Sequence, residues 1–149
     1  MRVILATLCM MLGQISYAAA ESFTFTVEFE PPVQKTVTVG ANSATLTTSA
    51  GKYVQKWTSG ATTTGEARCT TWSTGKAEGF DSRGLCETKD NDGGTADFLF
   101  SCNYLNENRT ESVCWGEQSG KGGRFDGRRG TVTWGQKNNI ASGRGLWKD

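Results

Sequence analysis

The chain of 149 residues contains no histidine and only two prolines. Without histidine, Ser-His-Asp and Cys-His catalysis are excluded, and so is every metal site that depends on an imidazole ligand. After the first 20 residues, no segment of ten or more residues carries apolar side chains at helical spacing. These absences argue against helical bundles and coiled coils, and they leave few side chains for acid–base chemistry.

Residues that favour strands and turns are abundant instead. The chain has 19 glycines, and 19 threonines follow residue 20. Threonine is β-branched and packs well in strands, whereas glycine permits tight turns. The composition therefore predicts an all-β domain.

The N-terminal segment has the three parts of a secretory signal peptide. Arg2 supplies a positive charge, Val3–Gly13 is largely apolar, and Ala18–Ala20 offers small residues for cleavage. As a helix, the apolar run would cover about 16 Å, well short of the roughly 30 Å of a bilayer core. We predict a signal peptide at residues 1–20 and a β-barrel domain at 21–149. The protein would be periplasmic or secreted, without a membrane span after cleavage. The alternative is a retained N-terminal anchor.

An even number of cysteines follows the signal, which predicts two disulfides in an exported small domain. The first two lie symmetrically about the turn-like stretch 75–79, and the last two about 106–109. The spacing therefore favours pairing within each of two hairpins. A zinc site is the alternative, but the sequence has no Cys-x-x-Cys and the spacings are long. The four residues are Cys69, Cys86, Cys102 and Cys114.

Alternation of apolar and polar residues indicates many short strands. The clearest is Ala96–Tyr104, which follows a strong turn signal at Asp90–Gly94. A polar loop is expected at Ser59–Gly65. The other expected strands are Phe23–Phe29, Thr36–Val39, Ala44–Thr48, Lys52–Thr58, Glu66–Ser73, Gly84–Thr88, Ser112–Gly116, Gly123–Asp126, Gly130–Gly135 and Gly143–Lys148.

This spacing of strands and turns is typical of an antiparallel sandwich or barrel. A barrel would also remove the exposed sheet edges that a threonine-rich strand protein must otherwise protect. We therefore predict a single antiparallel β-barrel of about eight to ten strands with two disulfides.

The stretch Gly122–Trp134 (GGRFDGRRGTVTW) carries a glycine pattern with an aromatic residue between two glycines. It resembles the G-[KR]-[FY]-x-G-x-x-G-x-x-T-[YW] stretch of small β-barrels of the allene oxide cyclase and dirigent kind. Similar stretches occur in exported bacterial proteins with an earlier Cys, Gly-x-Cys and D-x-D-G turn, as at Cys69, Gly84–Cys86 and Asp90–Gly93 here.

The resemblance implies an eight-stranded antiparallel barrel with a central cavity. It also implies that Gly123 and Gly127 form tight turns or bulges, while Phe125 plugs the interior between them. The matching stretch is structural, so it implies no catalytic residue.

Aromatic side chains are the candidates for a binding site. Rings that line a barrel lumen can hold an apolar or sugar ligand, although they can equally fill the core. We select Tyr53, Trp57, Trp72 and Trp134 as ligand-binding candidates. The resulting hypothesis is a non-catalytic barrel, without a cofactor, that binds a small apolar or aromatic ligand in its lumen.

The densest acidic group comprises Asp90, Asp92 and Asp97. Calcium prefers several oxygen ligands, but an EF-hand loop would need an oxygen donor where this chain has Gly94 and a glutamate where it has Ser101. We interpret the group as a solvated turn and predict no metal site. If the protein is an enzyme, the candidates include the strand carboxylates Glu28, Glu66, Glu87 and Asp97.

Charge is uneven along the chain. Residues 21–116 carry 8 basic and 12 acidic side chains, whereas residues 117–149 carry 7 basic and 3 acidic ones. A basic end can attract polyanions. We interpret its arginines as outward-facing charges on a sheet and expect no nucleic-acid partner. They include Arg124, Arg128, Arg129 and Arg144.

Two other function classes stay open. The protein is an envelope or secreted protein-binding module, such as an inhibitor or host-interaction factor, if exposed loops such as Ser59–Gly65 and Asn106–Glu111 carry its function. It is a cyclase-like or isomerase-like enzyme if the lumen performs chemistry.

Overall fold

The computed structural model describes residues 20–73 and 79–148, which form nine strands and one short 3₁₀ turn. The expected signal segment therefore lies outside the described residues, apart from Ala20. The elements are β1 (Glu21–Phe29), β2 (Val33–Val39), β3 (Asn42–Trp57), β4 (Thr62–Ser73), β5 (Ser82–Asp90), β6 (Thr95–Tyr104), β7 (Glu111–Gly122), η2 (Gly123–Phe125), β8 (Arg129–Lys137) and β9 (Ile140–Lys148).

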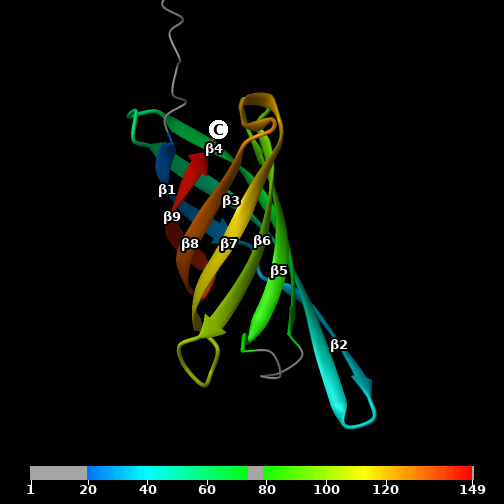
Figure 1. The fold of residues 1–149 in the computed structure, drawn as a ribbon. Coiled ribbons are helices and arrows are strands. Elements are labelled where there is room, and N and C mark those ends of the chain that lie inside the picture. Colours follow the sequence, from blue (N-terminus) through cyan, green and yellow to red (C-terminus); the bar gives the residue numbers. More distant parts are fainter. Residues whose placement is uncertain (1–19, 74–78, 149) are drawn as a thin grey trace, which may run out of the picture.

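All strand pairings among these residues are antiparallel, and the sheet runs in the order β1-β9-β8-β7-β6-β5-β4-β3-β2 (Figure 1). An additional pairing of β1 with β3 joins the two sides of the sheet. Eight strands consequently close into a barrel, and β2 lies outside it. This confirms the predicted antiparallel barrel.

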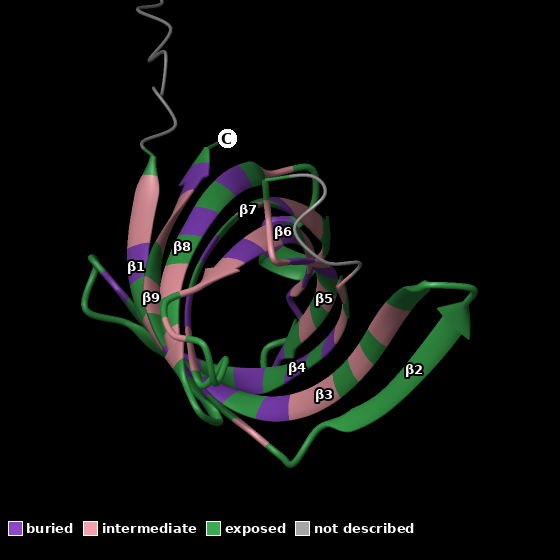
Figure 2. Cartoon of the chain, turned by 90° about the horizontal axis from the view of Figure 1, so that it is seen from below, coloured by how far each residue is buried: buried purple, intermediate pink, exposed green. Residues whose placement is uncertain are grey.

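Strand β3 is long enough to serve both the barrel and the outside strand. Its second half, Gly51–Trp57, pairs with β1, and its first half, Asn42–Thr48, pairs with β2. Pro31 and Pro32 separate β1 from β2, and the β2–β3 hairpin then extends away from the barrel wall (Figure 2).

Alternate residues of each barrel strand face the lumen, as the period of two requires. On β1, the lumen-facing Phe23 and Val27 are buried while Thr24 and Thr26 are more exposed. Both disulfides form as predicted, Cys69–Cys86 between β4 and β5 and Cys102–Cys114 between β6 and β7. Most of the turn expected at 75–79 lies outside the described residues.

Three local expectations were wrong. The separate strands expected at Ala44–Thr48 and Lys52–Thr58 are one strand, because Ser49–Gly51 continues the ladder with β4. The expected polar loop Ser59–Gly65 is shorter, since β4 begins at Thr62. The expected strand Gly123–Asp126 is instead occupied by the 3₁₀ turn η2, which begins at Gly123 with φ +61° and is followed by Gly127 with φ +74°.

The two ends of the barrel differ. The β7–β8 connection, which contains η2, lies at the same end as the start of β1 and the end of β9 (Figure 1). The β6–β7 connection lies at the opposite end, as does the β2–β3 hairpin. Within the described part of the chain, no helix has the length and apolar character to cross a membrane.

Candidate functional site: an aromatic lumen with one open end

The barrel encloses a cavity of about 370 Å³. Apolar and mostly aromatic side chains from opposite sides of the barrel form much of its wall. Hydroxyl-bearing side chains also line it, among them Ser49, Thr71, Ser82, Thr88 and Ser112. Phe100 and Trp134 meet edge to face with their ring centroids 5.0 Å apart. The apolar lining comprises Phe23, Phe25, Val27, Phe29, Tyr53, Ala67, Phe98, Phe100, Val132, Trp134 and Ala141, together with the cystine residues Cys69, Cys86 and Cys102.

Polar residues surround the cavity at the end that holds the β6–β7 connection. Glu30, Gln34, Arg109, Asn138 and Asn139 line it there, and all five are exposed. The guanidinium of Arg109 lies over the ring of Tyr104 at 5.3 Å from its centroid. The site therefore combines an apolar interior with a polar, solvent-accessible rim.

Stacked aromatic rings close the other end. Phe125 of η2 is 3% exposed, and its ring stacks on Trp147 at 4.9 Å and on Trp57 at 6.0 Å between centroids. The ring of Phe23 packs against that of Trp57, with 5.2 Å between the ring centroids, and Phe23 also lines the cavity. The plug role expected for Phe125 from the sequence resemblance is thus observed.

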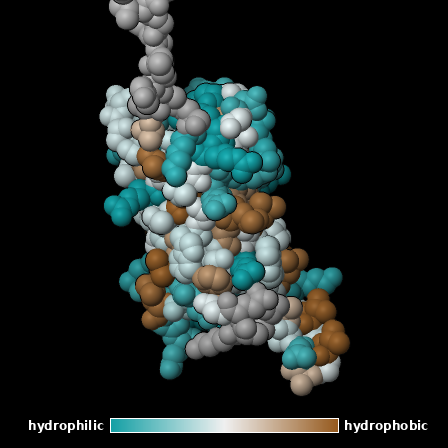
Figure 3. Space-filling view, in the orientation of Figure 1, coloured by the Kyte–Doolittle hydropathy of each residue, from teal (hydrophilic) through white to brown (hydrophobic). Residues whose placement is uncertain are grey.

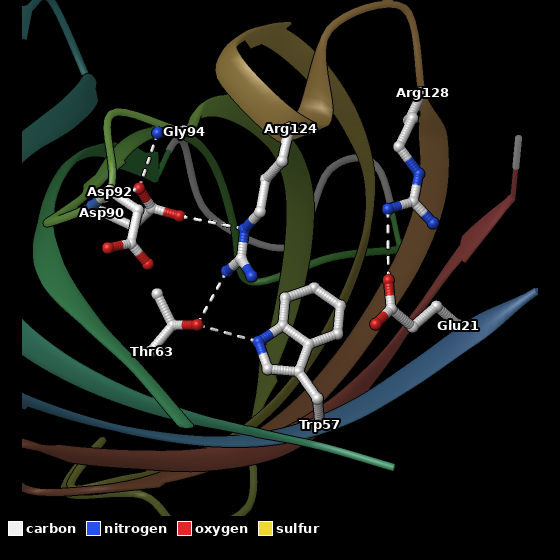
Figure 4. A network of polar contacts seen from close by, with 8 residues as sticks. All are labelled: Glu21, Trp57, Thr63, Asp90, Asp92, Gly94, Arg124 and Arg128. Carbon is white, nitrogen blue, oxygen red and sulfur yellow. Dashed lines mark hydrogen bonds and ion pairs between the residues drawn. The ribbon is translucent and has the colours of Figure 1, made fainter. Parts of the chain in front are cut away.

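Arg124 lies over the aromatic plug and makes the polar contacts shown in Figure 4. The Arg124 guanidinium lies 4.5 Å from the ring centroid of Trp57 and 4.6 Å from that of Phe125. Its Nη2 donates to Thr63 Oγ1 at 2.8 Å, and Trp57 Nε1 donates to the same oxygen at 2.9 Å. Arg124 therefore links β3, β4 and η2 at the closed end.

Asp90 is the anionic partner of Arg124. Its side chain is fully buried, and Oδ2 lies 3.2 Å from Arg124 Nε in an ion pair without a well-aligned hydrogen bond. Oδ1 accepts the main-chain N–H groups of Asp92 and Gly94, which shapes the β5–β6 turn (Figure 4). The turn predicted at Asp90–Gly94 is confirmed, but its interpretation as solvated was wrong for Asp90, whose carboxylate is buried and bonded within the protein.

Other charges near this end are also paired. Arg128 Nη1 lies 3.2 Å from Glu21 Oε2 (Figure 4). The interpretation of these arginines as outward-facing charges on a sheet was therefore wrong for Arg124 and Arg128, which lie in the β7–β8 connection. Arg124 covers the aromatic plug, and the side chain of Arg128 is only 17% exposed. Arg129 and Arg144, on β8 and β9, are exposed as expected.

Tyr53 lies between the cavity and the charged pair at the closed end. Its side chain lines the cavity and is 7% exposed. Burial raises its pKa well above the ordinary value of 10.0, and the negative charges of Asp90 and Asp92 raise it further against the opposing effect of Arg124. The phenol is therefore neutral at physiological pH and keeps an O–H group that can donate a hydrogen bond.

The structure brings two of the four proposed ligand-binding residues to the cavity. Tyr53 and Trp134 line the cavity, whereas Trp57 packs in the aromatic plug at its closed end. Trp72 projects from the outer wall, where it is 40% exposed. The alternation along β4 places Trp72 on the face opposite to Ala67 and Cys69. Tyr53 and Trp57 share the inward face of β3, and only the packing of η2 separates their places.

Sequence reasoning did not select the phenylalanines that form most of the aromatic wall. Phe25, Phe98 and Phe100 all line the cavity. The sequence did indicate that these phenylalanines face inward, since they occupy the apolar positions of the two clearest alternating segments. The alternation identified them as inward-facing but not as neighbours of an empty space.

The strand carboxylates that the sequence offered as candidates for an enzyme do not face the lumen. Glu28, Glu66, Glu87 and Asp97 alternate with lumen-facing residues and so project outward, and Asp97 lies 3.6 Å from Lys121. Among the described residues, no group of three or more acidic, cysteine or histidine side chains is arranged to hold a metal ion.

Large apolar side chains are also exposed on the outer wall of the barrel (Figure 3). The strand register places Trp72, Arg83, Ser101 and Trp115 in one row across β4, β5, β6 and β7. These residues line a groove with Leu99, which is 63% exposed. The two tryptophans stand about 14 Å apart, as three strand spacings require.

The chain was compared with protein-family models, with curated proteins and with solved structures, and none of the three comparisons finds a match.

Proposed function

We propose that this protein binds a small apolar or aromatic molecule in the lumen of its barrel. One observation carries the proposal: a cavity of about 370 Å³ is walled by aromatic rings, plugged at one end and rimmed by polar residues at the other. Small-molecule sites have this character, with apolar walls, a few polar groups and volumes of roughly 300–1,000 Å³. The polar rim suits a ligand whose polar group stays near solvent.

Binding is favoured over a cyclase-like or isomerase-like activity by the distribution of titratable groups. Glu30 lies at the rim, Asp90 is held by Arg124, and the strand carboxylates project outward. General acid–base catalysis needs a positioned group within hydrogen-bond reach of the substrate. The neutral phenol of Tyr53 supports orientation of a ligand better than proton abstraction.

A fluorescent aromatic anion, 1-anilinonaphthalene-8-sulfonate, tests the site. We expect its emission to rise on binding and the tryptophan emission to be quenched, because Trp134 faces the cavity. Ala67→Phe fills the lumen and should weaken probe binding at least tenfold. Leu99→Phe adds a ring on the outer wall and serves as the matched control. Equal binding by both variants and the parent protein would place the probe elsewhere and contradict the proposal.

We also propose export with removal of residues 1–20. The two disulfides indicate an oxidising compartment, and the N-terminal pattern is typical of a secretory signal peptide. Intact mass of the exported protein tests this, with a chain that begins at Glu21 as the expected result. A native spectrum of the same sample would reveal a co-purified ligand as extra mass that is lost on denaturation.

A second candidate function is protein binding through the outer wall. The two loops expected to carry it lie at opposite ends of the barrel and cannot form one surface (Figure 1). The groove between Trp72 and Trp115 is the better candidate, since tryptophan and arginine dominate protein interfaces. Trp72→Ser/Trp115→Ser should abolish cross-linking to a partner while probe binding in the lumen is retained.

A further inference from the structure

Strand β2 has an unpaired edge. Among the described residues it pairs only with β3, and all seven of its residues are exposed. Figure 2 shows the opposite edge of β2 turned away from the barrel, with no strand beside it. A free edge presents unpaired main-chain N–H and C=O groups that can pair with another strand.

The hairpin turn shows which main-chain groups are free. Gly40 and Ala41 form a two-residue turn, and Gly40 at φ +60° indicates type II′. Such a turn starts from a hydrogen-bonded pair, here Val39 and Asn42, and hydrogen-bonded pairs then alternate along the ladder. The odd-numbered residues of β2 therefore bond to β3. The free edge carries the main-chain groups of Gln34, Thr36 and Thr38.

This edge has little of the usual protection against pairing. Natural edge strands are blunted by proline, bulges or charged side chains, especially lysine. Within β2 there is no proline, the register with β3 is unbroken, and the single charge is Lys35. Val33 and Val39, at the two ends of the strand, are 71% and 74% exposed. A strand with these properties is better suited to pairing with another strand than to exposure to solvent.

We propose that β2 pairs antiparallel with β2 of a second copy of this chain, about a two-fold axis at Thr36. In this register the free groups of Gln34 meet those of Thr38 of the second copy, and Thr36 meets Thr36. The two copies exchange about six main-chain hydrogen bonds, as the antiparallel pattern requires. The sheet then continues from β3 through both β2 strands to β3 of the second copy.

The side chains of β2 are self-complementary in that register. Val33 stands opposite Val39 of the second copy, so the most exposed apolar side chains of the strand cover each other. Lys35 stands opposite Val37 rather than opposite Lys35, which avoids a direct like-charge pair. A second copy therefore pairs the free main-chain groups, covers the exposed valines and keeps the two Lys35 side chains from standing directly opposite each other. This combination favours a second copy over an unrelated strand. The same face continues onto Leu46 of β3 and Trp72 of β4, which are paired neighbours.

Opposite charges at Thr36 test the pairing. Sedimentation of the purified protein should show a concentration-dependent monomer–dimer equilibrium with a dissociation constant on the order of micromolar, since the interface is small. Thr36→Glu and Thr36→Lys should each be monomeric, and mixing them should restore a one-to-one dimer. Thr24→Glu, at an exposed position on β1, is the matched control and should dimerise like the parent.

A cross-link tests the register. Directly opposed residues of a hydrogen-bonded pair have Cα atoms about 5.5 Å apart, within reach of a disulfide. Thr36→Cys should therefore form a covalent dimer on mild oxidation, while Thr24→Cys should not. A parent protein that stays monomeric at every soluble concentration would overturn the proposal. So would a dimer that both charged Thr36 variants retain, because its interface would lie elsewhere.

Discussion

At the scale of single residues, the closed end depends on one buried charge. Asp90 directs one carboxylate oxygen to two turn amides and the other to Arg124, and Arg124 in turn covers Trp57 and Phe125. Such an ion pair adds little net stability over an apolar pair, but removing one partner leaves a buried charge or polar group unpaired. The pair therefore holds η2 against the β5–β6 turn.

Asp90→Asn should lower the free energy of unfolding by about 2–3 kcal/mol, somewhat less than a fully buried pair would lose because Arg124 is partly exposed. The asparagine amide retains an oxygen that can accept the turn amides, so the loss of stability reflects removal of the negative charge. Urea unfolding measures this loss. Asp97→Asn removes the exposed partner of Lys121 and should cost less than about 1 kcal/mol. Equal losses would show that the buried pair has no special role.

Tyr53 predicts a specific loss of stability at high pH. Its folded-state pKa is raised above the ordinary value of 10.0, so the unfolded chain releases this proton first as pH rises. The associated stability is complete below pH 10 and falls by about 1.4 kcal/mol per pH unit above it. Urea unfolding at pH 9 and pH 11 should show a smaller alkaline loss in Tyr53→Phe than in the parent. Identical losses would contradict the buried, neutral phenol.

At the scale of elements, the plug depends on close packing of η2 against β7. A Cβ atom at Gly120 would overlap the main-chain carbonyl of Phe125. Gly120 N–H also donates to Arg128 O at 2.8 Å, which ties β7 to the end of the connection. The position therefore has room for glycine only, unless η2 moves.

Gly120→Ala should lower the free energy of unfolding by about 1–3 kcal/mol, as overpacked cores do. The fluorescence of Trp57 and Trp147 should change with it, because Phe125 stacks on both rings. Gly135→Ala is the control, since a Cβ there meets nothing closer than Ser112 O at 4.0 Å. A destabilisation of similar size in Gly135→Ala would indicate that backbone entropy, rather than the plug, is responsible.

At the scale of the whole molecule, the barrel is closed by contacts between distant parts of the chain. The first strand pairs with the last, from Glu21 opposite Trp147 to Glu28 opposite Ile140. The disulfides instead join neighbouring strands, and both project to the lumen, where Cys69, Cys86 and Cys102 form part of the cavity wall. They consequently stabilise the barrel and shape the candidate site.

Each disulfide should contribute on the order of 3 kcal/mol, because the bridged residues are 17 and 12 positions apart and the chain-entropy term varies slowly with loop length. Cys69→Ala/Cys86→Ala and Cys102→Ala/Cys114→Ala should therefore lose similar amounts in urea unfolding. Losses below about 1 kcal/mol in both double variants would contradict a stabilising role of the cross-links through restriction of the unfolded chain.

Alternation and short-range spacing are local properties, so they were enough to predict the strand class, to favour one pairing of the cysteines and to indicate the inward faces. The interior place of Phe125 was implied only by the resemblance of Gly122–Trp134 to small β-barrels. Only the tertiary structure decided which inward residues surround empty space and which fill it, since that depends on strands far apart in the sequence. It also decided that Arg124 pairs with Asp90, and that β2 leaves the barrel while β1 closes it. The ion pair depends on the packing of η2 against the β5–β6 turn. The separate places of β1 and β2 depend on β3, which pairs with both of them along one edge.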